Sequence, residues 1–398
     1  MRLVDEPMLF LETLRNDKYL YEDTIHIGLN NQRTFYGISN KIDGFLRLPC
    51  LKWTFIIFYP ILLLMYVLLS FLMILVRNVI SKHITLESGN YFIAATPFSK
   101  SINSRVNRNV GDACWIMNCY NNFRHYDIIS GNYVSCIQLI NIKDVFAVTF
   151  EVLIVYVLLM QKYGAFYMLE SFNALQWFLL YRACRQIPAT SHIFFINHKD
   201  RWAYLEDKLE CVHKTLIQHG TERIYCSKEE AERRGLIPVG CYFVHNIPNR
   251  YHTLNKIITL SEQENEALKK SILDCHPSFV VGGYGFETYS LNSKRFSVLI
   301  ICHSGLYFDK EVEIIKALKD FDIDLYVKNH PTQTNEGYER LEKSCRFTLI
   351  SGQKFPHVNL VITYDSTLAH EYQSVGVEVL YHTFISTEQI KKIIKNRL

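Results

Sequence analysis

The stretch Val358-Asn-Leu-Val-Ile-Thr-Tyr-Asp-Ser-Thr-Leu-Ala-His-Glu371 predicts a strand, a polar turn and the start of a helix. Its apolar, β-branched beginning suits a buried parallel strand, and the helical part is expected to end at Gly376. Asp365, Ser366 and Thr367 are residue types that cap helix N-termini, where free backbone N–H groups and the positive end of the dipole gather. An anion can therefore bind at this turn.

Three further residues extend this expected site. Glu371 lies one helical turn after Thr367 on the same face, where its carboxylate is placed to accept hydrogen bonds from a ribose diol. Upstream, the run 323–327 predicts another strand, which delivers Lys328 and His330 to its C-terminal end. Because open α/β sheets bind ligands at that edge, we expect the two strand ends to meet on one phosphate-like group.

Each of these residues also has a simpler explanation. His330-Pro331 terminates a strand, since proline cannot continue the ladder, and a second such dipeptide occurs at His276. Ser366 and Thr367 serve as plain caps, and Glu371 as an exposed first-turn acid. Context favours ligand contact for His330, because it follows a strand and a lysine whereas His276 precedes a strand.

The strand-end His-Pro, the later Ser-Thr turn and the Glu on the next helix together resemble bacterial surface-polysaccharide glycosyltransferases of the GT-B type. These are the capsule, O-antigen and teichoic-acid enzymes, akin to the sialyl-, Kdo- and CDP-glycerol-transferase families. The resemblance implies that His330, Ser366 and Thr367 hold the nucleotide phosphates and that Glu371 holds the ribose. It also implies a nucleotide-activated sugar as donor substrate and no separate cofactor.

The C-terminal half has the pattern of a doubly wound sheet. Its apolar runs are 279–281, 297–302, 323–327, 347–350, 360–363 and 377–381, and they alternate with amphipathic stretches at 310–320, 335–344 and 368–375. Alternating strands and helices predict parallel sheets. The predicted fold class is therefore α/β and GT-B-like, with two Rossmann-like domains and an N-terminal membrane-embedded helix.

Two strand ends of the N-terminal half carry candidates for a catalytic base. The run 192–197 leads into His198, Asp200 and Arg201, and the run 216–218 leads into His219, Gly220 and Thr221. Inverting glycosyl transfer needs a base for the acceptor hydroxyl and groups that neutralise the departing phosphate. Since the second domain supplies the phosphate groups, the base is expected from the first.

We predict His219 or Asp200 as this base, with His198, Arg201, Gly220, Thr221 and Ser304 as secondary site residues. The stretch Gln218-His-Gly-Thr221 resembles one in CDP-glycerol-type transferases. The alternative is that Asp200 pairs with Arg201 and that His219 is a satisfied loop histidine. The two D-x-D sequences, Asp320-Phe-Asp322 and Asp322-Ile-Asp324, lie at the start of a predicted strand and not at its C-terminal end. A GT-B cleft can neutralise the departing phosphate without a metal, so we expect a metal-independent reaction.

Composition and one long apolar segment suggest the setting. The formal charge of +4 gives no indication of a nucleic-acid partner, and the 11 cysteines lack a C-x-x-C pair, as reduced cytosolic thiols do. Residues 53–76 contain no charge and exceed the roughly 20 residues that cross a bilayer. Pro60 and Ser70 leave a spanning helix, a re-entrant helix and an in-plane anchor open, and the flanking charges barely favour either orientation of a spanning helix.

The expected domains are a lead-in at 1–52, a membrane-embedded helix at 53–80, an acceptor domain at 85–255 and a nucleotide-donor domain at 256–398. The predicted activity is transfer of a sugar from a nucleotide donor to a lipid-linked or glycan acceptor, on the cytosolic face of a bacterial inner membrane. One alternative is a CDP-glycerol-type polyol-phosphate transferase. Another is a non-catalytic scaffold in a polysaccharide assembly complex.

Overall fold

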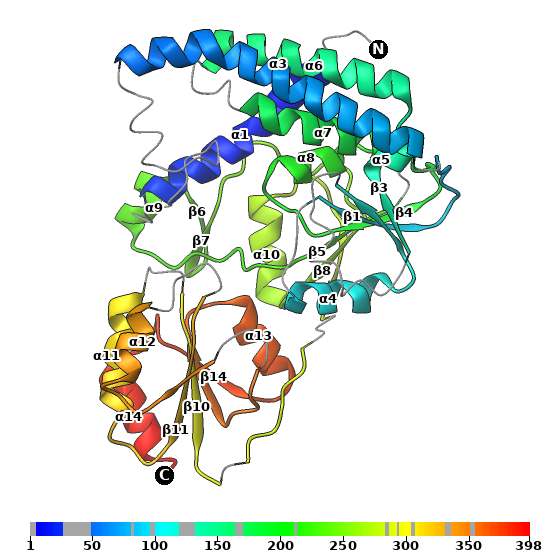
Figure 1. Ribbon diagram of the computed structural model, residues 1–398. Helices are drawn as coiled ribbons and strands as arrows, with labels where there is room; N and C mark the ends of the chain where they lie inside the picture. Colours follow the sequence, from blue (N-terminus) through cyan, green and yellow to red (C-terminus); the bar gives the residue numbers. More distant parts are fainter. Residues whose placement is uncertain are drawn as a thin grey trace.

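The computed structural model describes residues 5–26, 49–80, 83–95, 100–118, 132–163, 170–210, 213–282, 286–292, 294–303, 307–330, 336–350 and 355–398. They form two α/β domains, one above the other in Figure 1, each built on a parallel sheet. The predicted site residue Ser304 lies outside the described residues, as does Pro331.

The first domain contains a seven-stranded sheet of order β3-β2-β1-β4-β5-β8-β9, in which all neighbours pair in parallel. Its strands are β1 (Asn90–Ala94), β2 (Cys114–Met117), β3 (Tyr133–Ser135), β4 (His192–Phe195), β5 (His213–Ile217), β8 (Lys256–Thr259) and β9 (Ser278–Val281). The strand order reverses direction between β1 and β4, which is where such sheets open a crevice at their carboxyl ends.

Helices cover both faces of this sheet (Figure 1). One face carries a large core that includes parts of α1 (Asp5–His26), α3 (Pro49–Ile80), α5 (Cys136–Leu139), α6 (Ile142–Tyr163), α7 (Ser171–Cys184) and α8 (Arg201–Asp207). The other face packs against α4 (Lys100–Val110). A short helix α9 (Lys228–Arg234) and the hairpin β6 (Ile237–Val239) and β7 (Tyr242–Val244) follow β5.

The second domain has a five-stranded sheet of order β12-β11-β10-β13-β14. Its strands are β10 (Ser297–Ile301), β11 (Asp324–Lys328), β12 (Thr348–Ile350), β13 (Leu360–Thr363) and β14 (Glu378–Tyr381), again all parallel. Its helices are α11 (Phe308–Leu318), α12 (Glu336–Glu342), α13 (Thr367–Ser374) and α14 (Thr387–Lys395). The predicted fold class, two doubly wound parallel-sheet domains in a GT-B-like arrangement, is confirmed.

The predicted boundary between the domains at 255/256 is wrong. β8, the helix α10 (Glu262–Ser271) and β9 complete the first sheet, because Ile257 pairs with Leu216 of β5 on one side and with Phe279 on the other. The run 279–281 is therefore the last strand of the first domain and does not open the second. The alternation of strands and helices continues unbroken through this region, so it does not reveal which sheet each strand joins.

The N-terminal lead-in also proves to be part of the first domain. In α1, Phe10 and Leu14 are buried, and the Phe10 ring lies edge-on to Trp177 with centroids 5.7 Å apart. Glu6 pairs with Arg182 at 2.9 Å, and Asp23 pairs with Arg234 at 2.7 Å. These buried contacts make residues 5–26 an integral helix of the domain, which its mixed, weakly patterned composition conceals.

Candidate functional site

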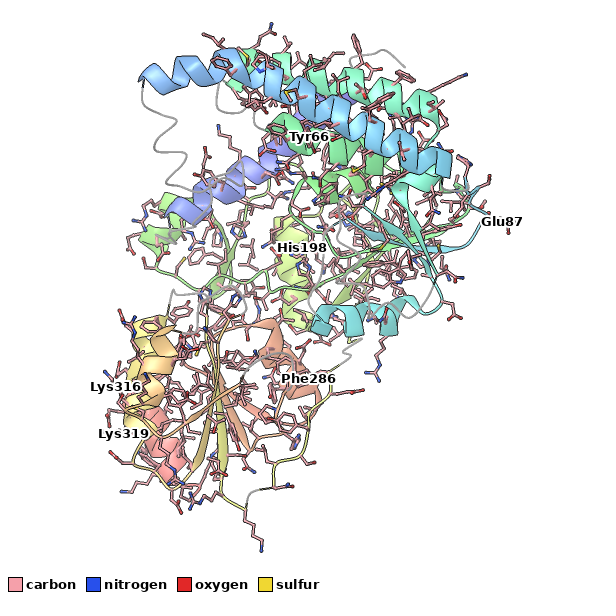
Figure 2. The ribbon with its side chains drawn as sticks, viewed as in Figure 1. Tyr66, Glu87, His198, Phe286, Lys316 and Lys319 are labelled. Carbon is pink, nitrogen blue, oxygen red and sulfur yellow. The ribbon has the colours of Figure 1, made fainter. Side chains whose placement is uncertain are left out.

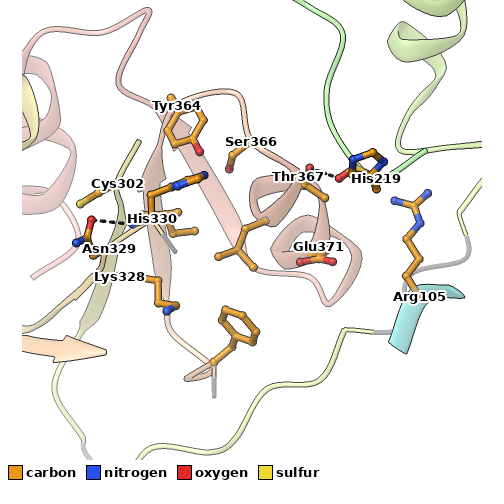
Figure 3. Close-up of a pocket in the computed structure, with 13 residues that line it drawn as sticks. Arg105, His219, Cys302, Lys328, Asn329, His330, Tyr364, Ser366, Thr367 and Glu371 are labelled. Atoms are coloured by element: carbon orange, nitrogen blue, oxygen red, sulfur yellow. Dashed lines mark hydrogen bonds between the residues drawn. The ribbon is translucent and has the colours of Figure 1, made fainter. Parts of the chain in front are cut away.

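A cavity of about 240 Å³ lies between the two domains, and side chains of both domains line it (Figure 3). The first domain contributes Arg105 and His219. The second contributes Ile301, Cys302, Lys328, Asn329, His330, Phe355, Tyr364, Ser366, Thr367, Leu368 and Glu371. The structure thus brings together all five residues predicted for phosphate and ribose, with one of the two predicted bases.

The N-terminus of α13 forms one side of the cavity. Ser366 is the N-cap, and its Oγ accepts a hydrogen bond of 3.2 Å from the backbone N–H of Ala369. Thr367 Oγ1 donates to the backbone carbonyl of His219 at 3.0 Å, which ties the two domains together at this point. Both hydroxyls therefore have structural partners, and the positive end of the helix dipole faces the cavity beside them.

Lys328 and His330 stand at the carboxyl end of β11, as their sequence positions predict. Burial lowers the pKa of Lys328. Burial and the neighbouring lysine lower the pKa of His330 as well. Both shifts arise because burial disfavours positive charge, and a phosphate bound nearby would favour it.

Glu371 lies one helical turn after Thr367, the first residue of α13, and is 5 % exposed. Burial raises its pKa to about 7, against the opposing effect of the Arg105 guanidinium. Arg105 comes from α4 of the first domain, so this electrostatic interaction crosses the cavity. The Glu371 side chain is therefore a buried group that changes charge near neutral pH, and not an exposed first-turn acid.

His219 faces the cavity from the loop after β5. Its Nδ1 lies 2.9 Å from the backbone carbonyl oxygen of Ile196. Since a carbonyl only accepts, Nδ1 carries the proton and Nε2 keeps its lone pair. Burial, followed by the charges of His198 and Lys199, lowers the pKa of His219 to about 3, so the ring is neutral at neutral pH.

Asp200 and Arg201 are not brought to the cavity. Asp200 is the N-cap of α8, where its Oδ1 accepts from the backbone N–H groups of Trp202 at 3.0 Å and Ala203 at 3.2 Å. Arg201 binds Glu170 at 2.6 Å in a buried pair. Both residues follow a strand in the sequence. The Asp200 side chain caps α8, and the Arg201 side chain joins α8 to the start of α7 through Glu170.

His198, Gly220 and Thr221 surround His219 without lining the same cavity. His198 lies inside the first domain (Figure 2), and its Nε2 is 2.8 Å from Glu222. The backbone carbonyl of Gly220 accepts from Gln218 at 2.8 Å. Thr221 Oγ1 donates to the backbone carbonyl of Asp365 at 3.3 Å, a second tie between the domains. These three residues position the loop that carries His219.

A second cavity, of about 480 Å³, adjoins the first and shares Tyr364 with it. Its walls include Asp23 of α1, residues 221 and 223–225 of the first domain, and Asp365 and Tyr307 of the second. Asp365 Oδ1 is 3.0 Å from Arg223, while its Oδ2 is buried without a hydrogen-bond partner. This cavity combines a carboxylate with tyrosine side chains, which suits a ligand that has many hydroxyl groups.

Sequence reasoning missed Arg105, Asn329 and Tyr364 as cavity residues. Asn329 and Tyr364 directly follow β11 and β13, so the rule that ligands bind at strand ends identifies both. Arg105 has no comparable signal, because it lies within a helix and reaches the cavity only through the packing of the two domains.

No family model matches the chain, and no curated protein matches its sequence significantly. Among solved structures, the wall teichoic acid polymerase TagF soaked with CDPG is 9% identical, over 74% of this chain and 69% of that chain, with a TM-score of 0.37. HepE of Anabaena in complex with UDP-glucose is 9% identical, over 78% and 89%, with a TM-score of 0.43. MurG of Acinetobacter baumannii is 9% identical, over 78% and 90%, with a TM-score of 0.35. These distant likenesses carry no argument about the reaction.

Proposed function

We propose that the chain is a membrane-associated glycosyltransferase that moves a sugar from a nucleotide donor to a lipid-linked or polysaccharide acceptor in bacterial surface polysaccharide synthesis. Its site would face the cytosol at the inner membrane, where activated sugars are made. One observation carries the proposal. A single cavity between two Rossmann-like domains holds a phosphate-type cradle on one wall and a neutral imidazole on the other.

The donor would bind against the second domain. Its diphosphate would lie between the N-terminus of α13 and the side chains of Lys328 and His330, and Glu371 would accept hydrogen bonds from the ribose. The arriving negative charge opposes the effect of burial on Lys328 and His330, because it raises the pKa of both groups. The diphosphate therefore stabilises the positive charge of the cradle.

The acceptor would approach from the second cavity, which opens beside Tyr364 and offers Asp365 and Tyr307 to its hydroxyl groups. In an inverting transfer, the acceptor oxygen attacks the anomeric carbon while its proton moves to Nε2 of His219. The bond from that carbon to the phosphate oxygen breaks, and the nucleoside diphosphate leaves with the electron pair. The hydrogen bond from Nδ1 to Ile196 holds the ring in the tautomer that this step needs.

The charge balance of the site favours the proton transfer only when the donor is bound. Burial keeps the His219 ring neutral, so the lone pair on Nε2 is available, but burial also lowers the proton affinity of the ring. A diphosphate nearby raises the pKa of the imidazole, because opposite charges stabilise the imidazolium. Lys328 and His330 would neutralise the departing phosphate. Side chains of the chain would thus supply both the base for the acceptor and the charge for the leaving group.

Calorimetric titration of the purified chain with CDP, UDP, GDP and CMP tests this proposal. We expect one nucleoside diphosphate to bind in a 1:1 ratio, and the preferred base then selects the donors for assays of transfer. A strong preference for CDP, followed by transfer of glycerol phosphate from CDP-glycerol, would replace sugar transfer with polyol-phosphate transfer at the same cavity. No binding of any nucleotide would contradict both reactions and favour a non-catalytic scaffold.

A further inference from the structure

The outermost helices, α3 and α6, lie side by side (Figure 1). Together they expose a broad apolar face. We define the apolar face by Phe58, Leu62, Leu69 and Val76 of α3 with Phe146 and Phe150 of α6. Leu69 exposes 64 % of its surface and Phe150 exposes 53 %. The exposed side chains of α3 extend from Ile57 to Val76, which corresponds to about 30 Å of helix. A patch of this length marks an interaction surface.

The opposite side of α3 packs into the first domain along most of its length. Tyr59, Leu63, Val67 and Ile74 are buried at helical spacing. The Tyr59 hydroxyl is 2.9 Å from the Ser171 hydroxyl of α7. Its ring stacks on Tyr156 of α6, and the two centroids are 5.7 Å apart. The helix is therefore fastened lengthwise to the domain, with protein on one side and an apolar surface on the other.

The segments on both sides of α3 belong to the same domain. Before it, α1 is held by the buried pairs Glu6–Arg182 and Asp23–Arg234. After it, β1 lies inside the first sheet between β2 and β4. A single crossing of a bilayer by α3 would place α1 and β1 on opposite sides and break these pairs. Ile57–Arg77 is long and apolar enough to cross a bilayer. The attachment of both α1 and β1 to the same domain argues against such a crossing.

Positive charges stand at the ends of the apolar face. Arg77 near the end of α3, Lys143 at the start of α6 and Lys162 at its end are all exposed. Basic side chains at the edge of an apolar helical surface contact anionic headgroups while the apolar residues enter the acyl region. This charge distribution is complementary to an anionic lipid surface.

We infer that the apolar face is embedded in one leaflet of an anionic bilayer, with α3 and α6 parallel to the membrane plane and the whole of both domains on one side. This inference rests on the membrane association in the proposed function, and it is independent of the transfer reaction. Among the three forms that the sequence leaves open for this helix, it selects the in-plane anchor.

The placement has a consequence for the acceptor. The sheet of the first domain lies between the helices α3 and α6 and the second domain (Figure 1). The cavity is lined by residues of the second domain and by Arg105 and His219, so it lies away from the apolar face. The reacting end of the acceptor must therefore stand away from the bilayer by about the thickness of a domain. An extended glycan meets this requirement, whereas a single sugar joined directly to its lipid does not.

Flotation of the purified full chain with vesicles of phosphatidylethanolamine and phosphatidylglycerol tests the inference. We expect Leu69→Arg on α3 and Phe150→Arg on α6 each to lower vesicle binding by roughly ten-fold or more, because each puts a charge into the acyl region. Val280→Arg, on the exposed strand β9, is the matched control and is expected to bind like the parent chain. All three positions are exposed, and an unchanged unfolding temperature checks that the variants fold.

Several results would overturn the in-plane placement. If Phe150→Arg binds vesicles like the parent chain, α6 does not enter the bilayer and α3 alone contacts it. Terminal tags on opposite sides of sealed membranes, detected by protease digestion, would show a crossing. A parent chain that stays off vesicles would remove membrane association altogether, and dimers that Leu69→Arg dissociates would identify a second copy as the occupant.

Two further readouts keep this inference distinct from the reaction. Nucleotide binding by Leu69→Arg is expected to be unchanged, so its loss would point to misfolding. Transfer to lipid-linked acceptors is expected to increase at least several-fold as the glycan lengthens. If a lipid that carries one sugar is used as fast as one that carries a long glycan, the cavity cannot be far from the bilayer. That result would leave the in-plane placement of α3 and α6 unchanged.

Discussion

The two walls of the cavity are assembled in different ways. The second-domain wall comes mostly from two short stretches, 328–330 and 364–371, which lie at the carboxyl ends of two strands of one sheet. The first-domain wall comes from Arg105 and His219, which belong to a helix and a loop far apart in the chain. Local sequence is thus enough to specify one wall, whereas the other exists only once the whole domain has folded.

The walls also differ in electrostatic character. The second-domain wall combines cationic groups and a helix N-terminus with one carboxyl group, whose pKa burial raises to about 7. The first-domain wall offers a histidine that burial keeps neutral. This difference predicts a division of labour in which one wall binds the donor and the other performs the proton transfer. The following substitutions test that division.

The largest effect is expected for His219→Asn, which removes the lone pair at Nε2. The turnover number should fall by about 10²–10⁴-fold, as is typical for loss of a general base, while the dissociation constant of the nucleotide stays unchanged. Steady-state kinetics with calorimetric nucleotide binding measures both. His213→Asn, at the exposed opposite end of β5, is the matched control. Weakened nucleotide binding in His219→Asn would show that the first-domain wall also binds the donor, which contradicts the division of labour.

The next effect is expected for His330→Ala in the phosphate cradle. Transfer should fall by roughly 10²–10³-fold, because a group that stabilises the departing phosphate is lost, and nucleotide binding should weaken as well. His276→Ala changes the other His-Pro dipeptide at an exposed position and should have no effect. Unchanged turnover in a folded His330→Ala variant would remove this histidine from the site.

Glu371→Gln tests the buried carboxyl group through its pH dependence. The pKa of Glu371 is raised to about 7, so between its ordinary value of 4.5 and 7 the unfolded chain loses this proton first. The stability of the parent chain should therefore fall across that window relative to the variant, by up to about 3 kcal/mol above pH 7. Urea unfolding from pH 4 to pH 8 measures the difference.

The same variant tests the expected contact with ribose. Nucleotide affinity of the parent chain should rise as pH increases through about 7, because the ionised carboxylate is the better acceptor of hydroxyl hydrogen bonds. Glu371→Gln should bind more weakly and without this pH dependence. Parallel pH profiles for the two chains would place the ribose elsewhere.

The smallest effect is expected for Asp200→Ala, which lies outside both walls. Loss of the cap of α8 should lower the free energy of unfolding by about 1 kcal/mol, since the N–H groups of Trp202 and Ala203 lose their acceptor. Turnover at a temperature where the variant is folded should be unchanged. A large loss of turnover there would restore Asp200 as a candidate base.

Strand ends were predictable because burial and backbone periodicity are local properties. The strands that deliver Lys328, His330 and His219 carry apolar, β-branched runs, and parallel sheets gather their carboxyl ends at one edge. The direction in which a side chain then turns was not predictable. Asp200 and His219 both follow strands of the first sheet, yet Asp200 caps a helix while His219 enters the cavity.

The amino-acid sequence by itself determined the α/β class, the strand-end residues that line the cavity and the long apolar helix, because each depends on the spacing of side chains within a few turns or strands. Only the tertiary structure decided the domain boundary, the approach of Arg105 to Glu371 and the lengthwise packing of α3. These features depend on contacts between segments far apart in the chain, and the local pattern is the same whichever partner a strand or helix finally meets.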